Sequence, residues 1–358
     1  MQECSAATNG RVRRWARRAV LLALGMLGAG LALWAQPGGR SQVPSIFAPE
    51  STPADQLYQL ALFVLAVCGG IFIVVFTLLV YSVVKFRRRD GDDGREPPQV
   101  YGSDQLEMAW TVIPVLIVVV LFLTSARVIH SVQDAREPAD AIEVTVVGHQ
   151  FWWEFRYTHY GFTTANELHV PVSDPSHPTP TFLTLLSADT DHSFWVPRLA
   201  GKTDLIPNKV NHLWIDPHNV GLYLGQCAQY CGVEHAKMLL RVYVQPRDQF
   251  DQWVKEQQQP AAVDPPPDAV AGRRVFESTA CINCHTIRGT VANGRFGPDL
   301  THLMSRDTIG SGILPNTPQT VRAWISNPDA FKPDCLMPAM NLSDDEWDQM
   351  AAYLATLR

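Results

Sequence analysis

The sequence predicts a multidomain chain: a two-helix transmembrane hairpin first, a small β sandwich or barrel next, and a small all-α domain last. Three observations predict this order. Two long uncharged apolar runs come first, short segments rich in β-branched and aromatic residues follow, and a helical pattern begins after a polar, proline-rich stretch at 257–267. The 358 residues allow two or three domains, and the net charge of −6 without a basic aromatic patch argues against nucleic-acid binding.

The first 35 residues predict a secretory signal peptide. An arginine-rich stretch precedes the apolar run Ala19–Trp34, and Ala35 stands just before Gln36 and Pro37. A basic segment, an apolar segment and a small residue in this order are typical of a cleaved signal, so cleavage is expected after Ala35. A retained anchor is the alternative.

A transmembrane hairpin is predicted over 36–135, with spans at about 57–84 and 108–130. Leu57–Val84 and Met108–Ala126 contain no charged residue, and each is near the ~20 residues that cross a bilayer. The loop between them carries Lys85 and several arginines, which predicts that the loop lies in the cytoplasm and that both outer ends of the hairpin lie on the other side of the membrane. A hairpin buried in a protein core is the alternative.

Four metal-binding side chains stand close together in the segment 227–238. They are Cys227, Cys231, His235 and Met238. Soft sulfur ligands favour copper, zinc or iron–sulfur chemistry, and a methionine beside cysteine and histidine favours copper. A second cysteine allows two thiolates to bridge two copper ions. A zinc site with two cysteines and two histidines, or a disulfide, is the alternative.

The same segment is predicted to be a loop between two strands of a β domain at 136–250. Its flanks, Val220–Leu224 and Leu239–Val244, are rich in β-branched and aromatic residues. A further histidine, His192, lies in another loop-like segment. Other strands are predicted at Ile142–Val147, Thr181–Leu186 and Val210–Ile215.

These residues closely resemble the binuclear copper (CuA) site in subunit II of haem-copper cytochrome c oxidases. The resemblance implies a cupredoxin-like Greek-key β domain. It also implies that Cys227 and Cys231 bridge both coppers, that His192 and Met238 complete one ion, and that His235 and the backbone carbonyl of Gln229 complete the other. Many family members have Glu at the position of Gln229, where the side chain helps to bind magnesium, so a magnesium site is not assigned here.

The resemblance also implies roles for two further positions, Glu107 and Phe151. Glu107, Trp110 and Pro114 match the family's E-x-x-W-x-x-x-P pattern, in which the glutamate lies at the cytoplasmic mouth of a proton pathway into subunit I. Phe151 stands where the family has the tryptophan that receives electrons from docked cytochrome c. The usual electron route into the copper site is therefore expected to be changed.

After a linker at 251–268, a second redox domain is predicted at 269–358. Cys281, Cys284 and His285 form the C-x-x-C-H motif that attaches c-type haem through two thioether bonds and one axial histidine. A thioredoxin-like C-x-x-C motif is the alternative. The region resembles a small class I cytochrome c, and Met337 before Pro338 matches the family's axial methionine. Ser343 and Glu346 predict a capping box at the start of the final helix, and Met340 is expected to be tied to that helix entrance.

The resemblance identifies the chain as a member of the subunit II family of bacterial cytochrome c oxidases, of the kind with a fused cytochrome c domain. It implies one haem c, the copper pair, and a place in the inner membrane with both redox domains outside. The implied partners are subunit I, with its haem and CuB, and subunit III. The donor would be a soluble or membrane-bound cytochrome c or an upstream quinol-oxidising complex. A membrane-anchored copper and haem carrier outside any oxidase is the alternative function, and a periplasmic thiol-disulfide protein is a further one.

Overall fold

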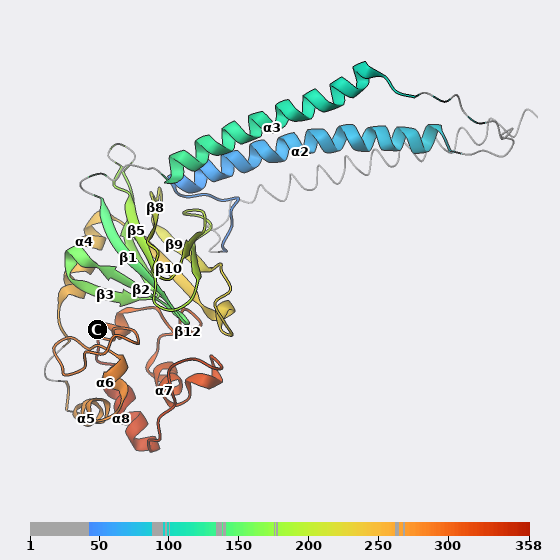
Figure 1. The fold of residues 1–358 in the computed structure, drawn as a ribbon. Coiled ribbons are helices and arrows are strands. Elements are labelled where there is room, and N and C mark those ends of the chain that lie inside the picture. Colours follow the sequence, from blue (N-terminus) through green and yellow to red (C-terminus); the bar gives the residue numbers. More distant parts are fainter. Residues whose placement is uncertain are drawn as a thin grey trace, which may run out of the picture. The chain divides into compact units, whose positions relative to one another are not determined.

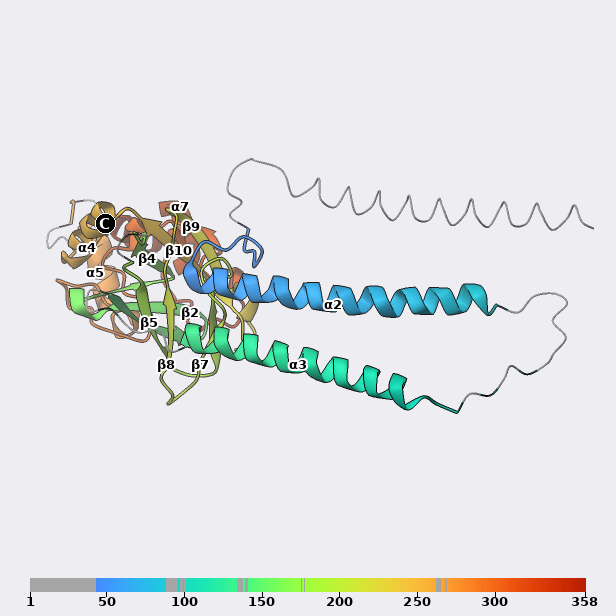
Figure 2. The same cartoon turned by 90° about the horizontal axis from the view of Figure 1, so that it is seen from above.

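A computed structural model describes residues 43–87, 96, 99, 101–133, 138, 141–174, 176, 178–261, 265–267 and 269–358. The predicted signal segment 1–35 lies outside the described residues. Two long helices come first, α2 (Thr52–Lys85) and α3 (Asp104–Gln133), and they run side by side (Figures 1 and 2). Both are long and apolar enough to cross a membrane, and the most apolar part of each is not buried in the protein. The predicted spans at 57–84 and 108–130 lie within these helices.

The β domain consists of two five-stranded sheets. The first has the order β3-β2-β1-β5-β8, with β3 at Phe162–Ala165, β2 at Trp152–Tyr157, β1 at Ile142–His149, β5 at Thr181–Ser187 and β8 at Asn211–Ile215. The second has the order β4-β10-β9-β6-β7, with β4 at Glu167–Pro171, β10 at Leu239–Gln245, β9 at Gly221–Cys227, β6 at His192–Trp195 and β7 at Thr203–Leu205. The β1–β5 and β10–β4 pairs are parallel, and the other strand pairs are antiparallel.

Alternating side chains explain how these strands enclose one core. In β2, Trp153, Phe155 and Tyr157 are fully buried, while the residues between them point to the other face. This period of two is what a half-buried strand requires. Helix α4 (Arg247–Gln258) follows β10 and buries Phe250 against the same core. The segment predicted as a linker, 251–268, therefore begins inside α4.

The C-terminal domain has its own core and consists mainly of helices: α5 (Val270–Ser278), α6 (Cys281–Cys284), α7 (Pro318–Ser326) and α8 (Asp344–Leu354). A short antiparallel pair, β11 (Thr308–Ile309) and β12 (Leu314–Pro315), precedes α7. Helices α5 and α8 approach closely at Gly272, where a Cβ atom would lie 1.8 Å from the carbonyl oxygen of Gln349. The predicted capping box of Ser343 and Glu346 begins α8.

The predicted order of two membrane helices, a β domain and a helical domain is therefore confirmed.

Candidate copper and haem centres

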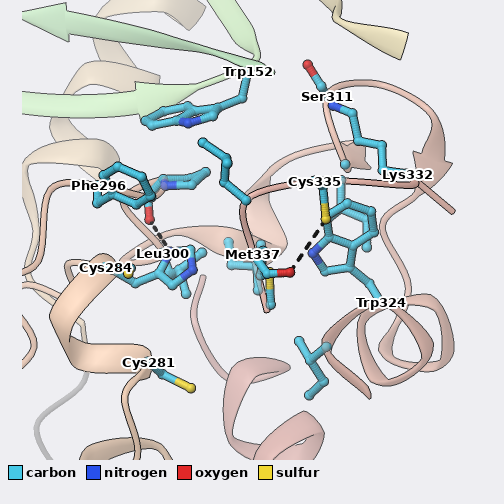
Figure 3. A pocket seen from close by; sticks show the side chains of 18 of the residues that line it. Trp152, Cys281, Cys284, Phe296, Leu300, Ser311, Trp324, Lys332, Cys335 and Met337 are labelled. Atoms are coloured by element: carbon cyan, nitrogen blue, oxygen red, sulfur yellow. Dashed lines mark hydrogen bonds between the residues drawn. The ribbon is translucent and has the colours of Figure 1, made fainter. Parts of the chain in front are cut away.

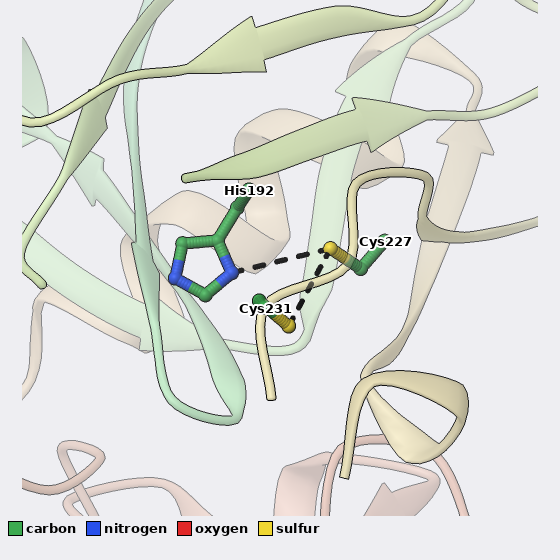
Figure 4. A group of neighbouring side chains, drawn as sticks. All are labelled: His192, Cys227 and Cys231. Atoms are coloured by element: carbon green, nitrogen blue, oxygen red, sulfur yellow. Dashed lines mark hydrogen bonds between the residues drawn. The ribbon is translucent and has the colours of Figure 1, made fainter. Parts of the chain in front are cut away.

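The copper-type ligands come together at the loop between β9 and β10. Strand β9 ends at Cys227, β10 starts after Met238, and between them only the 3₁₀ turn η2 (His235–Lys237) is regular. Strand β6 pairs with β9, and this brings its first residue, His192, to the same end of the domain. The prediction of a loop between strands is confirmed, and Figure 4 shows His192 facing the two thiols.

The two cysteines are the centre of this cluster, with their Sγ atoms 3.9 Å apart. Cys227 Sγ lies 3.9 Å from His192 Nδ1 and 3.2 Å from the Gln229 carbonyl oxygen. Cys231 Sγ lies 3.6 Å from His235 Nδ1 and 3.9 Å from Met238 Sδ. Metal–thiolate bonds are about 2.3 Å long, so sulfurs at this separation can bind the same ions. All the predicted copper ligands are thus together.

The imidazole of His192 is fixed from both sides. Its Nε2 lies 2.8 Å from Asp189 Oδ1, and this leaves Nδ1 toward Cys227. The ring also packs on Gly148, where a Cβ atom would come within 2.8 Å of it. Burial opposes protonation of His192, but the bonds to Asp189 and Cys227 outweigh it and raise its pKa.

The paired thiols differ in acidity because they share one hydrogen bond. The hydrogen bond between the two thiols lowers the pKa of Cys227 and raises the pKa of Cys231. One thiolate is therefore readily available in the metal-free protein, and the second proton leaves when a cation binds. Two buried thiols, two imidazoles and a thioether are a donor set that fits soft copper.

The haem-type motif is placed by α6. Cys281 and Cys284 begin and end this helical turn, and His285 follows directly. His285 Nδ1 donates to the Pro298 carbonyl at 2.8 Å, so Nε2 remains as the nitrogen that can bind iron. Burial lowers the pKa of His285, which keeps the imidazole neutral, as a metal ligand must be.

A largely apolar pocket surrounds this motif (Figure 3). Phe276, Leu300, Trp347 and Met350 contribute to its lining, and both Met337 and Met340 reach it. Gly297 comes so close to the His285 ring that a Cβ atom there would lie 2.6 Å from Cε1. Two thiols and a fixed histidine in an apolar pocket fit a covalently bound porphyrin.

Sequence reasoning did not find that the β domain forms part of this pocket. His149, Gln150, Phe151, Trp152 and Asp189 line it together with the haem motif. Neither spacing nor composition reveals a contact across more than a hundred residues. The available signal was Phe151 in place of the family's tryptophan.

Glu107 lies far along the chain from both centres, in the first turn of α3. The other end of the same helix contacts the β domain, where Trp214 Nε1 donates to the Val132 carbonyl at 2.8 Å. Glu107 therefore lies at the end of the 30-residue helix opposite to that contact, as the predicted topology requires.

Comparison with known proteins finds three family matches along the chain. Residues 42–128 match the family "Cytochrome C oxidase subunit II, transmembrane domain", 166–244 match "Cytochrome C oxidase subunit II, periplasmic domain", and 269–358 match "Cytochrome c". Cytochrome c oxidase subunit 2 of Alkalihalophilus pseudofirmus is 35% identical over 317 residues, which cover 87% of this chain and 90% of that protein. The protein of the same name from Bacillus sp. (strain PS3) is 32% identical over 334 residues, covering 88% and 91%.

A solved structure, the periplasmic domain of cytochrome oxidase subunit II from Bradyrhizobium japonicum, is 26% identical, with a TM-score of 0.32. The match covers 34% of this chain and 97% of the chain in the solved structure. The three family matches fall on the two long apolar helices, on the β domain with the copper-type cluster and on the domain with the haem-type pocket. The two relatives are matched over nine-tenths of their length. The chain therefore belongs to the cytochrome c oxidase subunit II family, as a membrane-anchored, electron-transferring subunit of a haem-copper oxidase with a periplasmic CuA domain and a fused cytochrome c domain.

Proposed function

We propose that this chain receives electrons from cytochrome c, or at its own haem c, and delivers them through CuA to subunit I of a proton-pumping oxidase. The observation that carries the proposal is the convergence of two thiols, two imidazoles, a thioether and a carbonyl beside a haem-type pocket. When bound, the copper pair and the haem each take up and release single electrons. The oxygen-reducing centre belongs to subunit I.

By the family resemblance, Cys227 and Cys231 would bridge the copper pair, His192 and Met238 would complete one ion, and His235 and the Gln229 carbonyl would complete the other. Each of these groups lies within 4 Å of one of the two sulfurs, which supports the ligand set. The burial of both thiols and of His192 supports this assignment, because a rigid, dry site limits reorganisation during electron transfer. Gln229 offers no carboxylate for magnesium.

Cys281 and Cys284 would hold the haem through thioether bonds, and His285 and Met337 would bind its iron. The fixed orientation of His285 supports its role. A methionine opposite histidine raises the haem potential, which suits a donor to copper.

The proposed setting is the bacterial inner membrane, with both redox domains on the outer side. Subunit I with its haem and CuB is the main partner, and subunit III is a further one. The electron donor is a soluble or membrane-bound cytochrome c or a quinol-oxidising complex. Glu107, at the cytoplasmic end of α3, lies at the mouth of a proton pathway into subunit I.

Electron paramagnetic resonance of the copper-loaded protein tests the central claim. Two bridging thiolates let two coppers share one unpaired electron, so a seven-line hyperfine pattern is expected. Met238→Leu should keep this copper but shift its potential, because a weak axial thioether tunes a soft site more than it holds the metal. A four-line pattern from isolated copper, or stoichiometric zinc without copper, would contradict the proposal.

A further inference from the structure

The segment Gln150–Trp152 lies between the two candidate centres. Gln150 and Phe151 connect β1 to β2, Trp152 begins β2, and all three residues line the haem-type pocket. In Figure 3, Trp152 reaches this pocket from the β domain, on the side away from Cys281. The pocket wall is therefore built partly by the domain that holds the copper ligands.

On its copper side, Gln150 is linked directly to one predicted ligand, Cys231, and through Asp189 to a second one, His192. The backbone N–H of Gln150 donates to Asp189 Oδ2 at 2.7 Å, and the other oxygen of Asp189 holds His192. The side-chain amide of Gln150 donates to the Cys231 carbonyl at 2.5 Å. A displacement of Gln150 would thus disturb both the imidazole and the thiolate side of the copper site.

On its haem side, the segment is bonded by a buried lysine of the other domain. Lys332 is only 3% exposed, and its Nζ donates to the Phe151 carbonyl at 2.6 Å. Burial lowers the pKa of Lys332 to about 8, with the nearby Glu234 acting in the opposite direction. A buried ammonium group without an acceptor is costly, so the bond to the Phe151 carbonyl strongly constrains the position of Lys332 relative to Phe151. Lys237 of the copper loop makes the converse contact, to the Phe331 carbonyl at 2.9 Å.

A second buried ionisable side chain, Glu167, bonds the two domains at another point. Glu167 of β4 is 2% exposed and accepts hydrogen bonds from the backbone N–H groups of Asp307 and Thr308, at 3.0 and 2.9 Å. Ser311 Oγ donates to the carbonyl of Leu239, the residue directly after Met238. The haem domain is thus attached on two sides of the pocket.

We propose that Gln150 and Lys332 are positioning residues that fix the haem pocket against the copper loop, so that the haem domain is a docked donor and does not swing on its linker. This rests on the proposed function, because it presumes haem c and CuA at the two centres. In the transfer concerned, the haem iron is oxidised from ferrous to ferric, and the mixed-valence copper pair is reduced by one electron. No atom or proton is transferred.

The test uses the full-length chain in its purified oxidase, with Lys332→Met, Gln150→Met and the control Lys255→Met, which changes an exposed lysine of α4. Hydrogen exchange is measured at the amides of Gln150 and Trp153. Losing the charge-assisted bond of Lys332 should raise this exchange about tenfold, and the control should leave it unchanged. The haem spectrum and the exchange of the β1 core amides establish that each variant is folded.

The second measurement is the haem-to-copper transfer rate after rapid photoreduction, in buffers of rising viscosity. The wild-type rate is expected to be independent of viscosity, whereas both positioning variants should be slower by about tenfold and become viscosity-dependent. A viscosity-dependent wild-type rate, or unchanged exchange in Lys332→Met, would overturn the proposal. Absence of the haem or CuA spectrum would instead refute the proposed function, and the exchange measurement can be read without either cofactor.

Discussion

At the scale of single residues, the proposed haem site offers two methionines as the second iron ligand. Met337 and Met340 both line the pocket, so proximity alone does not choose between them. Met340 stands just before the Ser343 cap of α8, whereas Met337 precedes Pro338, which favours an extended backbone at Met337. These constraints make Met337 the freer side chain to bind iron.

We therefore expect Met337→His to keep a low-spin haem but to lower its potential, because a second imidazole replaces the thioether. Met340→Leu should change the spectrum little. The measurement is the sulfur-to-iron charge-transfer band near ~695 nm, together with a redox titration. Loss of this band in the Met340 variant and its retention in the Met337 variant would reverse the assignment.

At the scale of elements, strand β4 and helix α4 are joined through one histidine. The ring of His169 stacks on Trp253 of α4, with centroids 4.2 Å apart, and on Tyr243 of β10 at 4.8 Å. Burial lowers the pKa of His169 to about 4, although Gln245 and Asp307 oppose the shift. The neutral ring is therefore the form that fits between its neighbours.

This stack predicts acid sensitivity of the β domain. Above pH 6.5 the ring is neutral in both folded and unfolded chains, but between pH 6.5 and about 4 only the unfolded chain takes up the proton. The free energy of unfolding should therefore fall by up to about 3 kcal/mol over this interval. His169→Phe should remove this decrease in the free energy of unfolding. The measurement is urea unfolding at several pH values, followed by circular dichroism. His212→Phe, at an exposed position of β8, is the control, and an unchanged pH profile in His169→Phe would contradict the prediction.

Local patterns predicted the elements well because local chemistry determines them. Uncharged length indicated α2 and α3, strand-like flanks indicated a loop for Cys227–Met238, and the Ser343 cap indicated α8. Helix α4 was not predicted, because its sequence is mostly polar and only a few side chains, such as Phe250, pack on the core. The polar composition of α4 reflects its exposed residues, and the few buried ones are too sparse to predict a helix packed on the core.

At the scale of the whole molecule, the sequence indicated both redox domains but not how they contact each other. Ligand types and spacing identify a metal loop or a haem motif, whereas the contact depends on pairs such as Lys332 with Phe151 and Glu167 with Thr308. These pairs join distant parts of the chain, and only the three-dimensional structure brings them together. Phe151 is 7% exposed, and its ring lies against Gly232 of the copper loop, so it does not offer an aromatic surface to a soluble donor.

This arrangement predicts that the oxidase depends on its own haem domain. Deleting 269–358 removes a donor whose effective concentration at the copper site can reach the millimolar range, and Phe151 lacks the indole of the tryptophan that the family uses for electron entry. Oxidation of reduced cytochrome c by the truncated complex should therefore be severely slowed. The CuA resonance serves as the control, because its retention shows that the copper loop is still assembled. Wild-type turnover in a truncated complex that keeps this resonance would mean that soluble cytochrome c reaches CuA directly.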